Sequence, residues 1–288
     1  MLINKLGAKF MNIKSLVTTS VIAMAAASAA QAADVIIPRE TAPAVISAAP
    51  SFSWTGFYIG GQVGNFSGKV DEFDSETKKK ITDKDWTPKP SGFMGGIYVG
   101  SNVDLGNGLI LGVETDAVWA DREDSKTHSA VIGETGLAAF KNKLTAAEAT
   151  FASGKNIDNV TKDGKRVEGT SIKEKWSGAT RVRIGFAAVD RILPYFAGGI
   201  AYTQLQVVNS LKAEGADGAE IASAKMFDQS KTMVGFTVGG GVDFAMTDNV
   251  LLRAEYRYSD FGKKAFVKDE DKIAYKTNDF RVGVAYKF

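Results

Sequence analysis

The stretch AYKTNDFRVGVAYKF, residues 274–288, decides the fold because apolar and polar side chains alternate along it. One face is apolar and consists of Phe280, Val282, Val284, Tyr286 and Phe288; the other carries Asp279, Arg281, Gly283 and Lys287. A period of two residues predicts a β-strand with two unlike faces. The stretch therefore predicts a strand that separates an apolar environment from a charged one.

Seven earlier stretches show the same kind of pattern. They are residues 55–64, 92–103, 109–119, 173–186, 193–205, 232–245 and 250–259. In 193–205 both faces are equally apolar, so the pattern does not determine which of its residues face inward. Each stretch reaches the roughly 9–11 residues that a tilted strand needs to cross a bilayer.

The connections alternate in length. Short turns are expected at 104–108, 189–191 and 247–249, and Asn107-Gly108 favours a hairpin. Long polar regions occupy 66–91, 120–172, 206–230 and 260–273. Short turns at one end and long loops at the other are typical of outer-membrane barrels. We therefore predict an all-β fold, an eight-stranded antiparallel transmembrane β-barrel with short periplasmic turns and four long extracellular loops.

A soluble sandwich of antiparallel sheets is the alternative, because its strands also alternate. Two features favour the membrane barrel. The polar faces carry charges of both signs, and aromatic residues fall near strand ends, where a membrane-interface girdle is expected. The expected girdle residues are Trp54, Phe57, Trp119, Trp176, Tyr195, Tyr258 and Phe288.

The N-terminal region predicts export. Residues 1–32 combine three lysines, an apolar stretch and the small-residue site Ala30-Gln31-Ala32, which is the pattern of a cleaved signal peptide. A retained membrane anchor is the alternative, and translation could start at Met1 or Met11. Residues 33–53 contain three prolines and are expected to form a periplasmic leader. Residues 54–288 are then the barrel domain.

Composition excludes several classes of protein. The whole chain has 35 basic and 33 acidic side chains, but the expected signal peptide holds three lysines and no acid, so the remainder is nearly neutral. No basic stripe indicates a nucleic-acid partner. The chain has no cysteine, which removes both disulfides and thiolate metal sites.

The most informative candidate site is the charge on the inward faces. It comprises Glu114, Asp116, Arg181, Arg183, Asp243, Arg253, Glu255, Arg257, Asp279, Arg281 and Lys287. An eight-stranded barrel is only wide enough for side chains to fill it, and an unpaired buried charge costs several kcal/mol. We predict a ladder of ion pairs that plugs the lumen; an ion or proton pathway is the alternative.

No pattern in the sequence indicates an enzyme or a bound cofactor. The sole histidine, His128, lies in the long region 120–172, where a solvated loop residue is the simplest interpretation; it remains a weak candidate for ligand binding. The glycine runs fit strands rather than a dinucleotide-binding loop. Residues 138–153 are rich in alanine and lysine and are expected to form a short helix.

Several motifs resemble one known family. They are FSWTGFYIGG at 52–61, GVETD at 112–116, LPYFAGG at 193–199, RAEYRY at 253–258 and VGVAYKF at 282–288. Together they resemble the outer-membrane immunogenic porin-like family of alphaproteobacteria, small β-barrels that include haemin-binding proteins. The resemblance covers the strands of most of residues 52–288; the loops show no match.

The resemblance implies location in the cell outer membrane of a Gram-negative bacterium and a role in envelope integrity and surface interaction. It leaves two alternatives open, a haemin-binding surface receptor and a small diffusion porin. Haemin is thus a possible ligand. The chain has a single histidine to ligate the haem iron, so a tyrosine would have to contribute as well. Expected partners are membrane lipid, lipopolysaccharide, the barrel-assembly machinery and host surface molecules. Tyr286 and Phe288 resemble the C-terminal assembly signal of such barrels.

Overall fold

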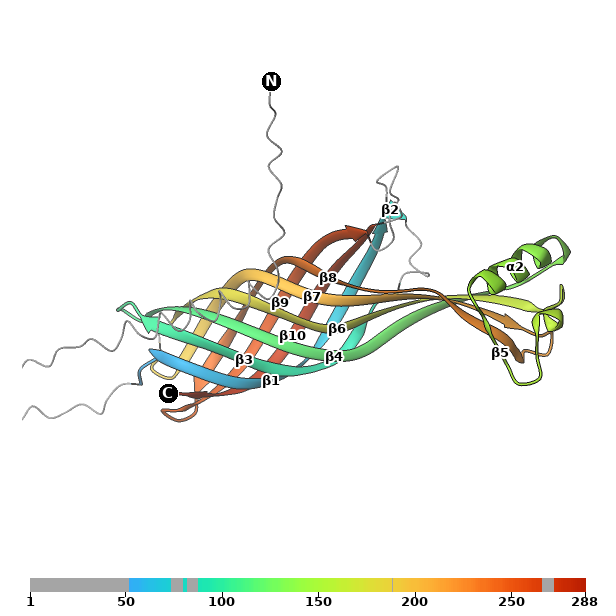
Figure 1. Ribbon diagram of the computed structural model, residues 1–288. Helices are drawn as coiled ribbons and strands as arrows, with labels where there is room; N and C mark the ends of the chain where they lie inside the picture. The colour runs from blue at the N-terminus through green and yellow to red at the C-terminus, as the bar shows by residue number, and fades with distance from the viewer. Residues whose placement is uncertain (1–51, 74–79, 82–87, 188, 266–271) are drawn as a thin grey trace, which may run out of the picture.

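The computed structural model describes residues 52–73, 80–81, 88–187, 189–265 and 272–288. Eight long antiparallel strands form a closed ring, as predicted (Figure 1). They are β1 (Gly56–Phe73), β3 (Ser91–Asp104), β4 (Leu109–Val131), β6 (Lys165–Phe186), β7 (Ile192–Glu214), β8 (Glu220–Ala245), β9 (Val250–Ala265) and β10 (Lys272–Lys287). The expected signal peptide and nearly all of the expected leader lie outside the described residues.

The ring closes where the last strand pairs with the first. β10 lies antiparallel to β1, from Tyr58 opposite Lys287 to Phe73 opposite Lys272. This pairing leaves neither strand with an open edge inside the ring, which a membrane requires because lipid cannot satisfy backbone groups. The three short turns and the C-terminus lie at the same end of the barrel (Figure 1).

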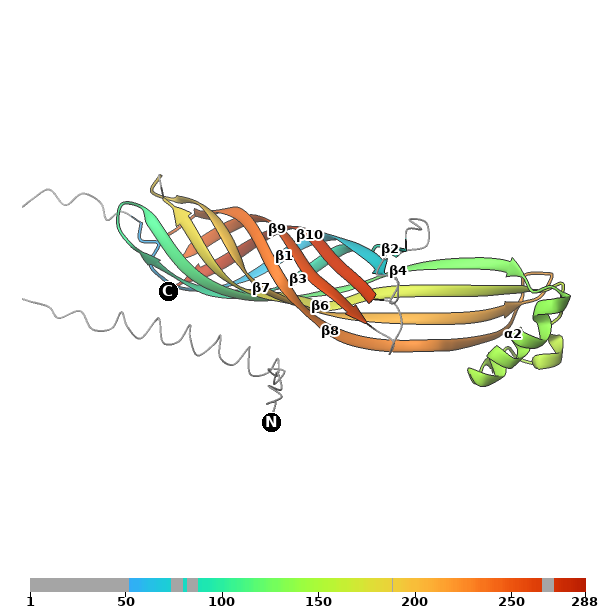
Figure 2. The same cartoon turned by 90° about the horizontal axis from the view of Figure 1, so that it is seen from above.

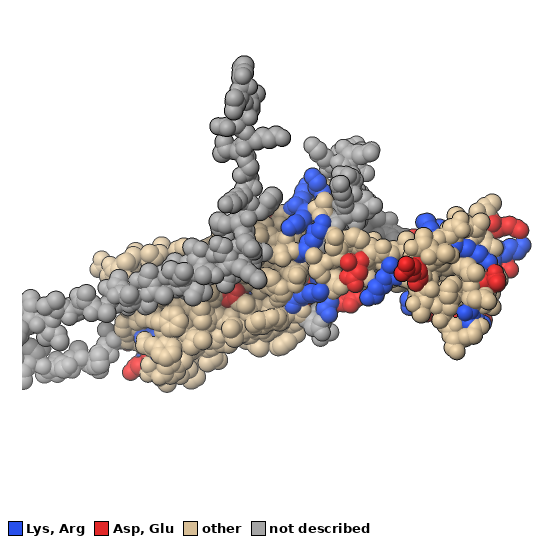
Figure 3. All heavy atoms as spheres, viewed as in Figure 1, with Lys and Arg blue, Asp and Glu red and all other residues tan. Residues whose placement is uncertain are grey.

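The two faces of each strand separate as expected. Inward side chains such as Arg281 and Glu255 are buried, whereas outward ones such as Val284 and Phe280 are exposed. On the face drawn in Figure 3 the barrel wall is almost free of charge, and charged residues gather beyond it. The exposed apolar wall is the surface that contacts lipid.

Two expected girdle residues face inward instead. Tyr195 is buried in the lumen, which settles the open parity of β7, and its hydroxyl donates to Glu255. Trp54 is buried at the end that holds the short turns, and its indole N–H donates to the carbonyl of Asp190. Both predictions were wrong because an aromatic ring with a polar group fits a polar lumen as well as an interface.

Two of the four predicted loops, 120–172 and 206–230, instead contain long extensions of the barrel strands. Beyond the ring, β4, β6, β7 and β8 continue side by side as a four-stranded sheet (Figure 2). We call this the projecting sheet; it consists of 122–131, 165–174, 205–214 and 220–231. Bulges in β4 and β6, between Trp119 and Arg122 and between Glu174 and Trp176, mark its junction with the barrel. Its largely polar composition hid it, because only a minority of its residues, such as Leu211 and Ala213, are apolar and buried.

A small apolar core covers one face of the projecting sheet at its far end. Helix α2 (Glu134–Ala146) places Phe140 and Leu144 against Leu211 and Ile221. The short strand β5 (Thr150–Phe151) pairs with β8, and the 3₁₀ helix η1 (Ile157–Asn159) follows. The short strand β2 (Lys80–Ile81) lies instead beside β1. No helix in the described part of the chain is long and apolar enough to cross a membrane.

The helix lies earlier than the predicted 138–153. It begins after Gly133, whose φ of 73° breaks the preceding strand, and it ends before Glu148, whose φ of 51° is left-handed. The expected range followed the alanine-rich composition. The observed range follows the four-residue spacing of Phe140 and Leu144, which buries one face.

Candidate functional site

The inward charges come from five strands that face one another across the lumen. β4 contributes Glu114 and Asp116; β6 contributes Arg181 and Arg183; β8, β9 and β10 contribute Asp243, Arg253, Glu255, Arg257, Asp279 and Arg281. All ten side chains are at most 6% exposed. Five carboxylates therefore share the interior with five guanidinium groups.

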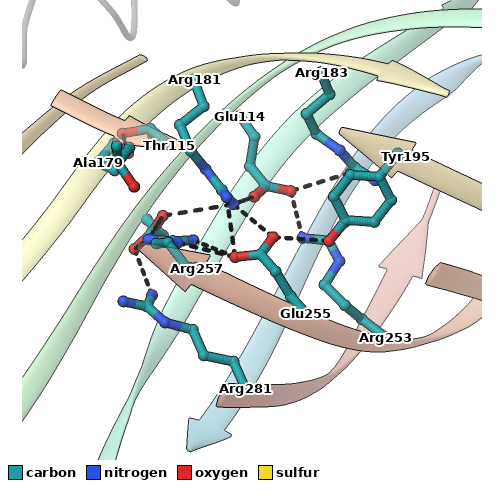
Figure 4. Close-up of polar contacts among 12 residues, drawn as sticks. Glu114, Thr115, Ala179, Arg181, Arg183, Tyr195, Arg253, Glu255, Arg257 and Arg281 are labelled. Carbon is teal, nitrogen blue, oxygen red and sulfur yellow. Dashed lines mark hydrogen bonds and ion pairs between the residues drawn. The ribbon is translucent and has the colours of Figure 1, made fainter. Parts of the chain in front are cut away.

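Glu114 lies at the centre of this network (Figure 4). Its carboxylate accepts from Arg181 at 2.6 Å, from Arg253 at 2.5 Å and from Arg183 at 3.2 Å. The hydroxyl of Tyr58 donates to it at 2.8 Å. One carboxylate thus joins three arginines that come from β6 and β9.

Two further carboxylates extend the network toward the outer end. Glu255 accepts from Arg181 and from Arg257, both at 2.9 Å. Asp116 accepts from Arg257 and Arg281 at 3.0 Å each. Carboxylates and guanidinium groups from β4, β6, β9 and β10 therefore alternate within the lumen.

The remaining two acids complete the pairing. Asp243 accepts from Arg183 at 2.6 Å and from Arg253 at 2.7 Å, and Asp279 accepts from Arg281 at 2.8 Å. Buried charges of one sign would be costly, whereas this arrangement pairs every guanidinium with at least one carboxylate. The lumen consequently carries many charges but little net charge.

Lys287 does not join the network. It points inward, but it lies at the end that holds the short turns, where its ammonium is 3.4 Å from the carbonyl oxygen of Thr55 and 5.4 Å from the ring centre of Phe52. The expectation that it pairs with a lumen acid was wrong because the tilt of β10 places it beyond the last carboxylate.

Three inward tyrosines belong to the site, although sequence reasoning did not assign them to it. Tyr58 hydrogen-bonds Arg183 and Glu114, and Tyr195 hydrogen-bonds Glu255. Arg253 lies 4.4 Å from the ring centre of Tyr98 and Arg183 lies 3.9 Å from that of Tyr195. The sequence did contain a signal for two of them, because Tyr58 and Tyr98 alternate in step with the polar residues of their strands and therefore share the inward face.

Glu174 is another inward acid that the sequence did not reveal. In the predicted strand 173–186, the alternation that places Arg181 and Arg183 inside also places Lys175 inside. The bulge beside Lys175 shifts this alternation, so Glu174 is buried instead. Tyr275 donates to its carboxylate at 2.5 Å. Apolar residues including Ile172 and Leu205 pack around this pair and fill the outer end of the barrel.

Apolar side chains fill the opposite end. Phe52 and Trp54, with ring centres 4.8 Å apart, pack with Leu193 and Leu251 in a buried cluster. The lumen is thus occupied along its length by an apolar cluster at each end and by the charge network between them.

The other candidate residues lie outside the lumen. His128 is exposed on the projecting sheet, opposite Glu168 of β6. No group of three or more histidine, cysteine or acidic side chains in the described ranges is arranged to hold a metal ion. Tyr286 and Phe288 are exposed on the lipid-facing wall, with ring centres 5.2 Å apart.

A test of the network compares two buried tyrosines. Tyr58→Phe removes a hydroxyl that contacts a guanidinium and a carboxylate, so we expect a loss of about 1.5–3 kcal/mol in the free energy of unfolding. Tyr98→Phe is the matched control, because the Tyr98 hydroxyl is buried without a hydrogen-bond partner among the described residues. Urea unfolding of the refolded barrel measures both; equal losses would contradict the assignment.

The closed ring agrees with the family that the chain matches. Residues 19–288 match the family described as outer membrane protein beta-barrel domain. The chain belongs to this family. As an outer-membrane β-barrel, the protein is located in the outer membrane of a Gram-negative bacterium.

Its curated relatives come from alphaproteobacteria. The barrel is 34% identical to the 31 kDa outer-membrane immunogenic protein of Brucella melitensis over 285 residues, which cover 96% of this chain and 100% of the relative. It is 28% identical to the 25 kDa outer-membrane immunogenic protein of the same organism, over 96% of this chain and 99% of that protein. The 22 kDa outer membrane protein of Rhizobium leguminosarum is 29% identical, over 83% and 80%.

Solved structures similar to this barrel are more distant. OprG from Pseudomonas aeruginosa has 11% identity and a TM-score of 0.41, covering 81% of this chain and 96% of that chain. Neisserial surface protein A has 17% identity and a TM-score of 0.36, with coverage of 81% and 98%. These similarities are too distant to add to the family assignment.

Proposed function

We propose that this barrel is a non-conducting outer-membrane protein that contributes to envelope integrity and carries the projecting sheet outward for contact with surface partners. The observation that carries the proposal is the lumen itself. Arg181, for example, reaches across it to Glu114 and Glu255 at 2.6 and 2.9 Å, so side chains occupy the path that a solute would take.

The two alternatives that the sequence left open have less support. A diffusion porin needs a water-filled lumen, whereas this one is crossed by ion pairs and filled at both ends by apolar clusters. A haemin receptor needs an axial ligand near an apolar slot, and His128 is instead exposed among polar neighbours. The relatives named above are described as outer-membrane proteins rather than as enzymes, which agrees with a structural and surface role.

The rim of the barrel supports lipopolysaccharide as a partner. Lys69 of β1 lies directly opposite Lys276 of β10, and both point outward beyond the apolar wall. Like charges in facing positions are unfavourable unless an anion lies nearby. Lys276 has an ion pair with Asp260 at 2.8 Å. The phosphates of lipopolysaccharide would supply further negative charge at the outer rim of the barrel.

Surface display can be tested with single cysteines, because the natural chain has none. Ser125→Cys lies on the projecting sheet, and Leu105→Cys lies in a short turn at the opposite end. We expect a polyethylene glycol maleimide too large for porins to label Ser125→Cys in intact cells. It should label Leu105→Cys only after the outer membrane is permeabilised. Labelling of Leu105→Cys alone in intact cells would reverse the proposed orientation.

A further inference from the structure

The projecting sheet contains a hollow that the barrel's closed lumen does not explain. It has a volume of about 340 Å³ and lies between helix α2 and strands β4, β6, β7 and β8. Its walls include Lys126, Lys143, Glu168, Thr170, Asn209 and Leu211. Small-molecule sites are typically hollows of roughly 300–1,000 Å³ with a few convergent polar groups, and this hollow meets both conditions.

The charged groups around the hollow are not paired with one another. Among the described residues, the side chains of Lys126, Lys143 and Glu168 make no ion pair or hydrogen bond, although they surround one space. Elsewhere on the same sheet some charges are paired, as Lys212 is with Glu220 at 3.2 Å. The unpaired groups therefore leave two donors and one acceptor available to a ligand.

A fourth polar group supports the same conclusion. The side-chain oxygen of Asn209 is enclosed and has no hydrogen-bond partner within the part of the chain that the structure describes. A bulge after Asn209 separates it from Ser210 in the pairing with β8. An enclosed carbonyl oxygen without a donor costs about 1–3 kcal/mol. Asn209 lines the hollow, so a rotation of its amide toward a ligand hydroxyl would remove that cost.

These groups define the chemistry of the ligand. Two ammonium groups require a negative charge, whereas Glu168 and the Asn209 oxygen require hydroxyl donors. A simple inorganic anion would satisfy the lysines but be repelled by Glu168. Leu211 and Met226 add an apolar strip to the wall. A carboxylate, several hydroxyls and an apolar ring face occur together in an acidic sugar.

The position of the hollow fits such a ligand. At about 3.3 Å per residue, Thr170 lies roughly 20 Å along β6 beyond Trp176, which faces lipid at the outer end of the wall. Saccharides at a bacterial surface, either of the cell's own lipopolysaccharide or of a host, extend through the space just outside the outer membrane. The hollow is therefore placed where an acidic sugar can reach it.

We propose that the hollow beneath α2 binds a carboxylated sugar residue, with Lys126 and Lys143 on its carboxylate and with Glu168 and Asn209 on its hydroxyls. The proposal rests on the surface role proposed above and names the class of partner. His128, the weak candidate from the sequence, lies on the same sheet face opposite Glu168, at the border of this site.

The test uses the full barrel refolded in micelles and titrated with sialyllactose, with a glucuronate-containing disaccharide and with neutral lactose. Saturation-transfer NMR and calorimetry measure binding. We expect both acidic sugars to bind and lactose not to bind. Replacement of both lysines, Lys126→Gln with Lys143→Gln, should weaken binding at least tenfold, the effect of losing about 1.4 kcal/mol. Asn209→Ala should weaken binding of the same sugars.

The matched control replaces two exposed lysines away from the hollow, Lys155→Gln with Lys165→Gln, and should leave affinity within about twofold. Titration with the core oligosaccharide of the cell's own lipopolysaccharide distinguishes a bacterial from a host source. Absence of binding by either acidic sugar, or equal binding of lactose, would overturn the proposal. Either result would leave the closed barrel intact, because the lumen is tested separately by conductance.

Discussion

Replacement of Glu114 by alanine is expected to lower the free energy of unfolding by about 3–5 kcal/mol, the cost of removing one partner from a buried ion pair. Glu114 accepts hydrogen bonds from Arg181, Arg183 and Arg253, and all three remain buried in the variant. The five carboxylates and five guanidinium groups would then be unbalanced in a space from which water is largely excluded. Glu114→Gln should cost less, because the amide oxygen still accepts a hydrogen bond.

Urea unfolding of the refolded barrel, followed by tryptophan fluorescence, measures this loss. Glu134→Ala is the matched control, because Glu134 is 81% exposed and pairs with Lys162 at 3.2 Å. An exposed pair contributes about 0–1 kcal/mol, so the control should unfold at nearly the urea concentration of the natural chain. Equal midpoints for Glu114→Ala and Glu134→Ala would mean that the lumen network does not stabilise the barrel.

Deletion of Phe288 is expected to produce the largest loss of assembly. Its backbone N–H donates to the carbonyl of Phe57 at 2.9 Å, and its ring lies 5.9 Å from that of Phe57 and 5.2 Å from that of Tyr286. These contacts close the seam between β10 and β1. Losing one hydrogen bond and two aromatic contacts costs about 2 kcal/mol, which lowers the equilibrium constant for folding roughly 30-fold.

Heat-modifiable mobility on gels reports the folded fraction after expression and after refolding in vitro. Phe186→Ala serves as the control, since Phe186 is an exposed aromatic on the same wall but lies in β6, away from the seam. If Phe288 also acts as a signal for the assembly machinery, the deletion should impair assembly more in cells than in vitro. Normal mobility of the deletion variant under both conditions would exclude a role in assembly.

The barrel was predictable because lipid and lumen impose opposite requirements on adjacent residues. Val282 and Val284 must be apolar while Arg281 must find a partner, and a similar alternation is visible in the ring strands other than β7. The turn at Asn107 was equally visible, and Asn107 adopts the left-handed φ of 54° that such turns require. Local pattern therefore determined the number of strands, their turns and their faces.

The rest required information that local pattern does not carry. The bulge beside Lys175 changed which residue faces inward, and nothing in the alternation of β6 marks it. The strands of the projecting sheet were predicted as loops because polar residues dominate them, although Leu211 and Ala213 are buried in the apolar core under α2. Their pairing depends on partners distant in sequence, such as Lys126 opposite Thr170. Register between distant segments is a property of the folded sheet rather than of a single stretch.

The candidate site was partly visible for the same reason. Strand parity identified the ten lumen charges, but it could not show that Glu114 contacts three arginines or that Lys287 stays outside the network. The hollow beneath α2 was hidden, because it combines residues from four strands and a helix whose approach depends on Phe140 and Leu144.

The most direct test of the closed lumen is a planar lipid bilayer recording of the refolded full barrel, with insertion verified by heat-modifiable mobility of the same sample. Ion pairs such as Arg183 with Asp243 at 2.6 Å would have to separate for an ion to pass. We predict that the current stays at its baseline across the applied voltages. A single steady unitary conductance would contradict the account and would identify the barrel as a pore.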